Sequence, residues 1–392
     1  MTIEPRRHPL GRLEAYSPEP PVEGGDAQES GKTTMTGPGR AHEVTELDVA
    51  FHAVDGGDDV AAQAPAMFAI GWPAYRQWYL RDGEEARPTY AQCHRQVGRH
   101  LPELLPDYER LVDAVGGGDL EARFLSHWAP PPLFAACSLA TWTNGSNLLV
   151  RNYDYPPQMC DATVLATGWG GTRVLGMSDC VLGLLDGVNE HGLSAAIAFG
   201  GRPAVGHGFG VGIVVRYVLQ TAADVGEALA ILGRVPVQVS YNIALVDRSG
   251  AAVIAYVAPD RPMSVSPVAV AGNRQGATEW DEHAQFCATE EREAALLAAV
   301  ADPGMTASRL VDTFLRPPVY RPVDDAPWGT LYTAVYDCDR GTVDLVWPDD
   351  HWRLRLDGFV PGRRARRLRV AVPPAEHIPT PAIAHGRPLL IV

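Results

Sequence analysis

A cysteine and two charged residues are spaced so that one β-hairpin would bring them together. Cys137 opens a short apolar run at 137–142, an Asn-Gly pair at 144–145 is a hairpin turn signal, and the returning run at 148–150 leads into Arg151-x-x-Asp154. In such a hairpin the start of the first strand lies close to the end of the second. Cys137 is therefore predicted to face a fixed cation and a fixed carboxylate, which is an arrangement suited to a reactive thiol.

A cysteine attacks as its thiolate, and an ordinary thiol pKa of about 8.5 leaves only a few per cent ionised at neutral pH. Histidine is the usual activating base, and His191 and His207 follow downstream, although neither sits in a recognisable Cys/His protease signature. A second base needs no histidine. Cleavage of the Ala136–Cys137 bond would give Cys137 an α-amine with a pKa of about 7.7–8, carried on the nucleophile's own Cα. Arg151 would then stabilise the thiolate and Asp154 would orient the ammonium.

Each of these residues also has a structural interpretation. An apolar-flanked cysteine such as Cys137 is commonly core filling, and Arg151 with Asp154 could form a structural ion pair. Farther along the chain, Asn242 could cap a turn and Arg292 could be a solvated helix residue.

Composition limits the classes of function. The chain has 392 residues, 46% of them hydrophobic and 20% charged, with a formal net charge of −14. That charge argues against a nucleic-acid partner, because phosphate binding needs a clustered positive surface. Six widely spread cysteines without a C-x-x-C pair indicate neither a zinc site nor a disulfide framework. We expect a cytoplasmic protein with no membrane partner, since there is no signal-like start and no apolar run of about 18 residues.

The first third of the chain is predicted to be non-catalytic. Residues 1–45 are rich in Gly, Pro, Ser and Glu and are predicted to be a disordered tail. Residues 46–136 show apolar spacing typical of helices and are predicted to be a helical segment, which would be a propeptide or small subunit if the chain is cut before Cys137. Three prolines at 130–132 require an extended approach to Cys137.

The rest of the chain alternates hairpins with grouped helices. Strands are predicted at 162–167, 172–177, 181–185, 193–199 and 265–271, with a turn at 186–192. Further hairpins are predicted at 240–257 and 331–347, with an edge strand at 351–356, and helices at 212–232, 288–301 and 306–315. This order favours an α+β fold, antiparallel sheets covered by helices, over a parallel sheet. The catalytic domain is predicted to span 137–371, followed by a Pro-rich tail at 372–392.

Six short motifs in order resemble one family. They are Cys137-Ser138, Arg151-Asn152-Tyr153-Asp154-Tyr155, Asp186-Gly187-Val188-Asn189 with Gly192-Leu193, Arg216 with Glu227-Ala228, Ser240-Tyr241-Asn242 with Asp247 and Gly250, and Thr289-Glu290-Glu291-Arg292. From about residue 95 to 350 the chain resembles the acyl-coenzyme A:6-aminopenicillanate acyltransferase-like family of autoproteolytic N-terminal-nucleophile (Ntn) hydrolases, also grouped as C45 peptidases.

The resemblance implies an αββα four-layer sandwich and a precursor that cuts itself between Ala136 and Cys137. It implies that Cys137 is nucleophile and α-amino base, tuned by Arg151 and Asp154. Asn242 would donate to the oxyanion through its side chain and Phe199 through a backbone N–H near its position, while Arg292 would support the site by its charge. One departure is Ala136, which stands where the penicillin acyltransferase has Gly.

The predicted function is hydrolysis or transfer of an acyl group from a linear amide or thioester through a Cys137 acyl-enzyme. No cofactor is expected, and coenzyme A would enter only as the carrier of an acyl thioester substrate. The expected partners are this small-molecule substrate and the chain's own propeptide. Two alternatives remain open: a Cys/His hydrolase that keeps its chain intact, and a non-catalytic Ntn-fold binding module.

Overall fold

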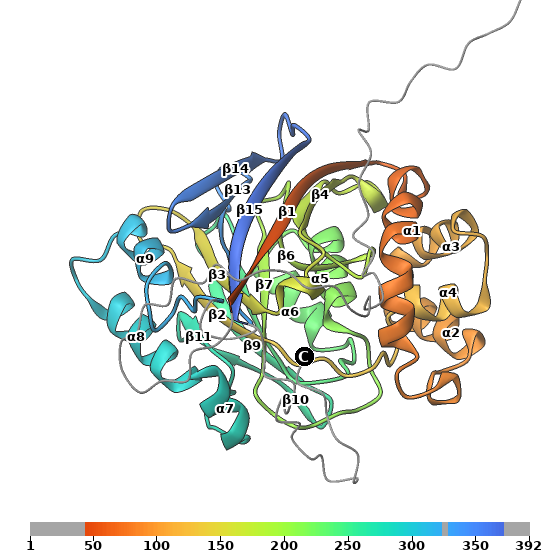
Figure 1. Cartoon of the computed structure of the whole chain (residues 1–392), viewed down its shortest axis with the longest axis horizontal. Helices are drawn as coiled ribbons and strands as arrows, with labels where there is room; N and C mark the ends of the chain where they lie inside the picture. The colour runs from red at the N-terminus through yellow and green to blue at the C-terminus, as the bar shows by residue number, and fades with distance from the viewer. Residues whose placement is uncertain (1–43, 324–327, 372–392) are drawn as a thin grey trace, which may run out of the picture. The chain divides into compact units, whose positions relative to one another are not determined.

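Two β-sheets form the centre of the molecule (Figure 1), a computed structural model that describes residues 44–323 and 328–371. The nine-stranded sheet has the order β10 (Arg261–Ser266), β9 (Ala252–Ala258), β8 (Tyr241–Val246), β7 (Ser194–Phe199), β6 (Gly183–Asn189), β5 (Val174–Asp179), β4 (Thr163–Thr167), β1 (Val44–Gly57) and β15 (Gly362–Ala371). The six-stranded sheet has the order β11 (Val270–Ala271), β2 (Ala136–Trp142), β3 (Leu148–Tyr155), β12 (Gly329–Asp337), β13 (Thr342–Trp347) and β14 (Asp350–Arg355).

The sheets lie face to face between two groups of helices. β2 packs on β7 and β8, and β13 packs on β5 and β6. Helices α5 (Val211–Thr221) and α6 (Val225–Leu232) cover the outer face of the nine-stranded sheet, while α8 (Thr289–Ala301) and α9 (Ala307–Phe314) cover that of the six-stranded sheet (Figure 1). The predicted α+β sandwich is confirmed. Strands β2, β3, β6 and β7 are buried along their whole length, because each sheet is covered on both faces.

The beginning of the predicted helical segment is a strand instead. Within β1, Val49, Phe51 and Ala53 are buried and alternate with more exposed neighbours, which is the period of a strand rather than of a helix. β1 pairs with β15 over residues 44–53 and runs parallel to β4 on its other side. The segment before Cys137 therefore supplies an internal strand of the nine-stranded sheet. The remainder is helical: α1 (Val60–Tyr79), α2 (Tyr90–His100), α3 (Leu105–Ala114) and α4 (Asp119–Leu125).

The predicted hairpins are present, and three predicted elements differ. The helix expected at 212–232 is interrupted at Ala222, which is extended, and Asp224 caps α6 by accepting from the Glu227 N–H. The strand expected at 265–271 is divided between β10 and β11, which belong to different sheets. Asp186, expected in a turn, lies inside β6. A further helix, α7 (Asp281–Cys287), precedes α8.

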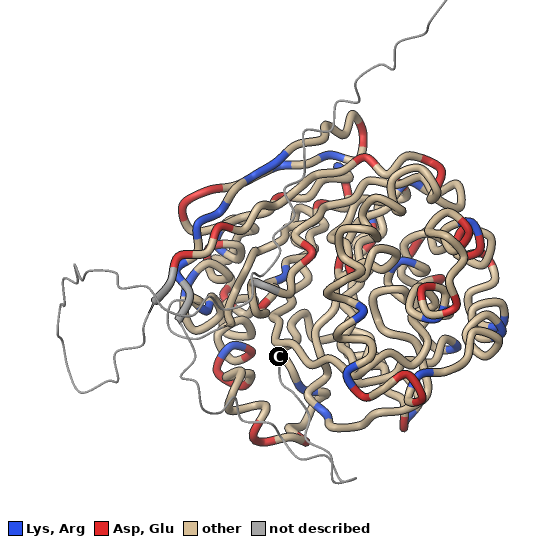
Figure 2. The backbone as a smooth tube through the Cα atoms, turned by 45° about the vertical axis from the view of Figure 1, so that its right-hand side comes forward, with Lys and Arg blue, Asp and Glu red and all other residues tan. Residues whose placement is uncertain are grey.

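The basic run at 363–367 lies on β15, among strands where basic and acidic residues are neighbours (Figure 2). Arg366 pairs with Asp349 and Arg367 with Asp48. The predicted tail at 372–392 and nearly all of that at 1–45 lie outside the described residues. Among the helices of 44–323 and 328–371, none is long and apolar enough to cross a membrane.

Candidate active site

The predicted hairpin forms, and its register decides which side chains share a face. Cys137 lies opposite Tyr153 and Ala136 opposite Asp154. Because side chains alternate along a strand, Cys137 and Arg151 point to the face turned toward the other sheet, while Asp154 points to the opposite face, toward α8. The expectation that both charged side chains face the thiol is thus correct only for Arg151.

Arg151 lies against the sulfur and joins the two sheets. Its Nη2 donates to Cys137 Sγ at 3.4 Å, and its guanidinium lies over the Tyr153 ring at 4.7 Å. Nη1 binds Asp186 of β6, and both side chains are 0% exposed. The structural ion pair proposed for Arg151 and Asp154 is therefore not formed, because the carboxylate on the same face comes from the other sheet. Asp186 also accepts from the hydroxyls of Tyr332, at 2.9 Å, and Tyr336.

The charge state of the thiol follows from burial. Burial raises the pKa of the Cys137 thiol, while the Arg151 guanidinium and the Asp154 backbone N–H act in the opposite direction. Burial likewise raises the pKa of the Asp154 carboxyl, against the Arg292 guanidinium and the Thr330 hydroxyl. Because the pKa of the buried thiol lies above its ordinary value, Cys137 is protonated at neutral pH in this structure.

Arg292, on α8, holds the backbone of Cys137 from the other face. Its Nη1 donates to the Cys137 carbonyl at 2.6 Å and to Ser138 Oγ at 2.8 Å. Nη1 also lies 3.5 Å from Asp154 Oδ2, and Nε donates to the Cys287 carbonyl at 2.8 Å. Arg292 is 0% exposed, so the alternative of a solvated helix residue is wrong.

Asn273 is the site residue that sequence reasoning missed. Its Oδ1 accepts from the Cys137 N–H at 3.2 Å and from Arg292 Nη2 at 2.6 Å. Its Nδ2 donates to the Phe199 carbonyl at 2.9 Å and approaches the Ala135 carbonyl at 3.5 Å. The available signal was a polar residue two positions after a short strand. What could not be seen is that β11 pairs with β2, which brings Asn273 beside Cys137.

Asn242 contacts the loop that carries Asn273, rather than Cys137 itself. Its Nδ2 donates to the carbonyls of Gly272 at 2.8 Å and Arg274 at 2.9 Å, on either side of Asn273. In the described residues its Oδ1 has no hydrogen-bond partner, and no hydrogen bond joins Asn242 to Cys137. Asn242 thus braces the loop that carries Asn273, rather than capping a turn. Its predicted role as oxyanion donor stays a prediction.

Phe199, at the end of β7, reaches the site through atoms other than the expected backbone N–H. Its carbonyl binds Asn273, and its ring packs on Phe134 with the centroids 4.8 Å apart. On the other side of the hairpin, Ala136 is 2% exposed and packs with Cys287 and Trp328.

The two histidines considered as bases are exposed, whereas Cys137 is 1% exposed. The buried histidine of this region is His283 on α7, whose Nδ1 lies 3.7 Å from Cys287 Sγ. Burial lowers the pKa of His283 to about 4, with the Arg292 charge acting in the same direction, so the imidazole is neutral at pH 7.

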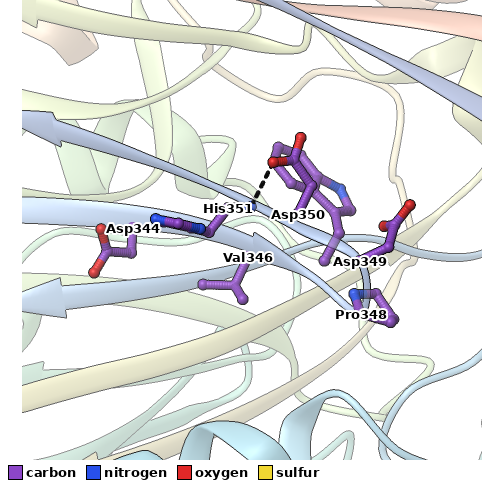
Figure 3. Close-up of a pocket in the computed structure, with 7 residues that line it drawn as sticks. Asp344, Val346, Pro348, Asp349, Asp350 and His351 are labelled. Atoms are coloured by element: carbon purple, nitrogen blue, oxygen red, sulfur yellow. Dashed lines mark hydrogen bonds between the residues drawn. The ribbon is translucent and has the colours of Figure 1, made fainter.

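A pocket lies apart from this site. This pocket, at the β13–β14 turn (Figure 3), is lined by Asp344, Val346, Trp347, Pro348, Asp349, Asp350 and His351, and contains none of the candidate residues. Within 44–323 and 328–371, no cluster of three or more His, Cys, Asp or Glu side chains is arranged to hold a metal ion.

Solved structures similar to this chain include a hydrolase and an acylase. One is a mutant of conjugated bile acid hydrolase from Clostridium perfringens, with 13% identity, a TM-score of 0.42, and coverage of 62% of this chain and 100% of that chain. The other is penicillin V acylase from Agrobacterium tumefaciens, with 16% identity, a TM-score of 0.40, and coverage of 57% and 86%. No curated protein matches the sequence.

A family comparison also finds a match. The family model described as acyl-coenzyme A:6-aminopenicillanic acid acyl-transferase matches residues 142–352, more than half of the chain. The matched segment includes Arg151, Asn273 and Arg292 and begins downstream of Cys137. The chain therefore belongs to the acyl-coenzyme A:6-aminopenicillanic acid acyl-transferase family.

Proposed function

We propose that this chain is an autoproteolytic cysteine Ntn enzyme that cuts itself between Ala136 and Cys137 and then hydrolyses or transfers the acyl group of a linear amide or thioester. One observation carries the proposal. The N–H, the carbonyl and the sulfur of Cys137 are each bound by a different buried polar side chain: Asn273, Arg292 and Arg151. A cysteine that only fills core needs no such set, because burying polar groups is costly without a specific use.

The first reaction is an N-to-S acyl shift. The Cys137 sulfur attacks the carbonyl carbon of Ala136, the C–N bond breaks, and the thiol proton ends on the new α-amine. Water then hydrolyses the thioester, which leaves a carboxylate on Ala136 and restores the Cys137 thiol. We propose Asn273 Nδ2, a side-chain donor next to the Cys137 backbone that approaches the Ala135 carbonyl at 3.5 Å, as the group that turns to the oxyanion formed on Ala136.

The second reaction uses the new amine as the base. Asn273 Oδ1, which accepts from the Cys137 nitrogen at 3.2 Å, would hold the amine in place. The amine takes the thiol proton, the thiolate attacks the substrate carbonyl, and the amine or thiol of the substrate leaves with a proton. Water or an acceptor amine then removes the acyl group from Cys137. Arg151 supports the thiolate by its charge. An acyl-coenzyme A thioester would serve as a substrate, and no resident cofactor takes part.

The segment before the cut is proposed to remain bound as a small subunit. β1 lies between β4 and β15 in the nine-stranded sheet, so losing it would expose the edges of two strands. Only the end near Ala136 has to move after cleavage, because residues 130–135 contain no helix or strand.

The test is the intact mass of the purified protein, measured together with acyl transfer from amides and thioesters. The expected products are two fragments, the larger beginning at Cys137. Cys137→Ala should stay whole, while Cys93→Ala, which removes another fully buried thiol, should still be cut. Full-length wild-type protein after long incubation would contradict self-cleavage. Thiol-dependent activity of that uncut protein would favour the Cys/His alternative, and absence of both cleavage and acyl transfer would favour the binding module.

A further inference from the structure

We propose that the carboxyls of Asp161 and Asp179, together with the hydroxyl of Tyr155, bind a protonated amine carried by the substrate. The enzyme would then prefer amides or thioesters with an ammonium group over neutral molecules of the same shape. This inference rests on the proposed function, because it names the class of substrate that the Cys137 site accepts.

The two carboxyls are neighbours at one end of the nine-stranded sheet. Asp161 lies just before β4 and Asp179 ends β5, and these two strands pair antiparallel, so the start of one meets the end of the other. Both residues are partly buried. Burial raises the pKa of each carboxyl, and the charge of Asp179 raises that of Asp161 further. We call Asp161 and Asp179 the acid pair.

The acid pair has hydrogen-bond donors but no paired cation. Asp161 accepts from the Tyr75 hydroxyl of α1 and from the backbone N–H of Cys180. Asp179 Oδ1 has the Cys180 thiol at 3.8 Å, and a Cβ on Gly212 would lie 2.5 Å from Oδ2, so that oxygen faces the first turn of α5. Within 44–323 and 328–371, neither carboxyl forms an ion pair. Buried carboxylates are costly without a cation, and a bound ammonium would supply one.

The Tyr155 hydroxyl points to a ligand independently of the acid pair. Tyr155 is 2% exposed, and among the described residues its hydroxyl has no hydrogen-bond partner. Burial raises the pKa of this hydroxyl, and Asp179 and Cys180 act in the same direction, so the hydroxyl is directed toward the acid pair. An ammonium has three donors, enough for one bond to each carboxyl and one to the Tyr155 oxygen. A metal ion fits less well, because no third ligand of the described chain completes a metal cluster here.

The acid pair and the nucleophile lie in one region between the sheets. Tyr153 is opposite Cys137, and Tyr155 follows two positions later on β3, so it points to the same face about 7 Å farther along the strand. Tyr241 of β8 connects the two from the other sheet. Burial raises the pKa of Tyr241, and Asp179 and Cys137 both act in the same direction, so both are within electrostatic reach of one hydroxyl. A substrate with its carbonyl at Cys137 can therefore extend a short chain to the acid pair.

The backbone beside the acid pair is held in an unusual conformation. Cys180 and Val181 have φ values of 51° and 70°, in the left-handed region that residues other than glycine seldom adopt. This turn presents both N–H groups to the Asp161 carboxyl. Residues in such conformations persist where their surroundings fix them. The turn therefore keeps Asp161 in place beside Asp179.

The experiment compares kcat/KM for two matched pairs of amides with the processed protein. One pair is 6-aminohexanoyl and heptanoyl 7-amino-4-methylcoumarin, and the other is N-butanoyl-1,4-diaminobutane and N-butanoylpentylamine. Within each pair a methyl group replaces the ammonium, on the acyl part in the first and on the amine part in the second. We expect the cationic member to react at least about tenfold better in one pair, as a hydrogen bond to a charged group provides. The pair that shows the preference identifies the part of the substrate that carries the charge.

Three variants assign that preference to the acid pair. Asp179→Asn should bring the ratio of cationic to neutral kcat/KM close to one, and Tyr155→Phe should lower it by about threefold, because one of three partners is lost. The matched control is Asp344→Asn, which changes another partly buried aspartate, on β13 and paired with Arg353, and should keep the ratio. A ratio defined in this way is not altered by a general loss of activity.

The outcomes separate this inference from the proposed function. A ratio of one or less in both pairs, or a preference that persists in Asp179→Asn, would overturn the inference. An equal fall of the ratio in Asp344→Asn would also overturn it, because the effect would then come from net charge. If Cys137 is acylated by the N-acetylcysteamine thioester of acetate but none of the four amides reacts, the inference alone fails. Absence of that acylation would overturn the proposed function.

Discussion

Each face of the β2–β3 hairpin contacts one fully buried arginine, Arg151 of β3 on the inner face and Arg292 of α8 on the outer face, and the two arginines have different partners. On the inner face, Arg151 binds the Cys137 sulfur and the Asp186 carboxylate of the other sheet. On the outer face, Arg292 binds the Cys137 carbonyl, the Ser138 hydroxyl and the Asn273 amide oxygen. The inner arginine therefore acts on charge at the sulfur, and the outer one acts on the position of the peptide group.

This difference follows from the alternation of side chains across a single strand. Because Arg151 and Asp154 are three positions apart, their side chains point to opposite faces of β3, and each contacts a different buried charged side chain, Asp186 and Arg292. The electrostatics of the thiol and the geometry of the 136–137 peptide bond can thus be changed separately. The predictions below use substitutions that alter one face while leaving the other in place.

The largest effect is expected on the inner face. Arg151→Met removes the cation and leaves Asp186 as a buried carboxylate with only tyrosine hydroxyls as partners. We expect a loss of about 3–5 kcal/mol in the free energy of unfolding, measured by urea denaturation, which is typical of breaking a buried ion pair. Adding Asp186→Asn should recover much of that loss. A double variant as unstable as the single one would show that Asp186 is not the reason.

The next largest effect is expected on the rate of self-cleavage when Asn273 is replaced, compared with replacement of Asn242. Asn273→Ala should slow self-cleavage by about 10²–10³-fold, the usual cost of losing one oxyanion donor. Asn242→Ala should have a smaller effect, because Asn242 contacts the loop and not Cys137. The rates come from the time course of fragment appearance. The reverse order would return the donor role to Asn242, as the family resemblance implies.

The outer arginine should affect rate without affecting thiol ionisation. Arg292→Lys keeps the charge but cannot reach Cys137 and Asn273 together, since only a guanidinium provides two parallel donors. We expect self-cleavage to slow by about 10²-fold through misplacement of the peptide. The pH profile of iodoacetamide alkylation at Cys137 should stay unchanged. Arg151→Lys should do the opposite and shift that profile, and a shift in Arg292→Lys would contradict the separation of the two faces.

The smallest expected effect is the change in the rate of self-cleavage for each pH unit. Burial raises the pKa of the Cys137 thiol in the uncut chain, so neutral pH lies below the folded pKa and the thiolate is the minor form. As pH rises toward that pKa, the thiolate fraction and the rate of self-cleavage should rise by about tenfold per pH unit. Rates measured between pH 6 and 8 check this. A rate independent of pH in that range would mean that thiol ionisation does not limit the shift.

The sequence predicts what depends on near neighbours. The hairpin around Cys137 could be placed because a turn signal lies between two apolar runs, and Arg292 could be assigned to a helix for the same local reason. The partner of Arg151 could not be predicted, since Asp186 reaches it from the other sheet. Asn273 was missed because β11 has only two residues and its neighbour β2 lies far away in sequence.

The same limit explains the first strand. Apolar residues recur at every second position from Leu47 to Ala53, yet a strand needs a partner, and the partners β4 and β15 lie more than a hundred residues downstream. The local pattern of side chains does not reveal pairings between strands that lie so far apart in the sequence. The break between α5 and α6 could not be predicted for a related reason. It depends on packing, and a run of apolar residues continues through it in the sequence.

The position of β1 has a consequence for assembly of the protein if the chain is cut as proposed. Before cleavage, β1 and its partner strands belong to one molecule, so they find each other at a rate that does not depend on protein concentration. After cleavage, the same strands belong to two molecules, and reassembly becomes a second-order event governed by mass action. The sheet would thus form before cleavage, within a single chain. A cut copy that unfolds in dilute solution would refold poorly, because its two fragments must first meet.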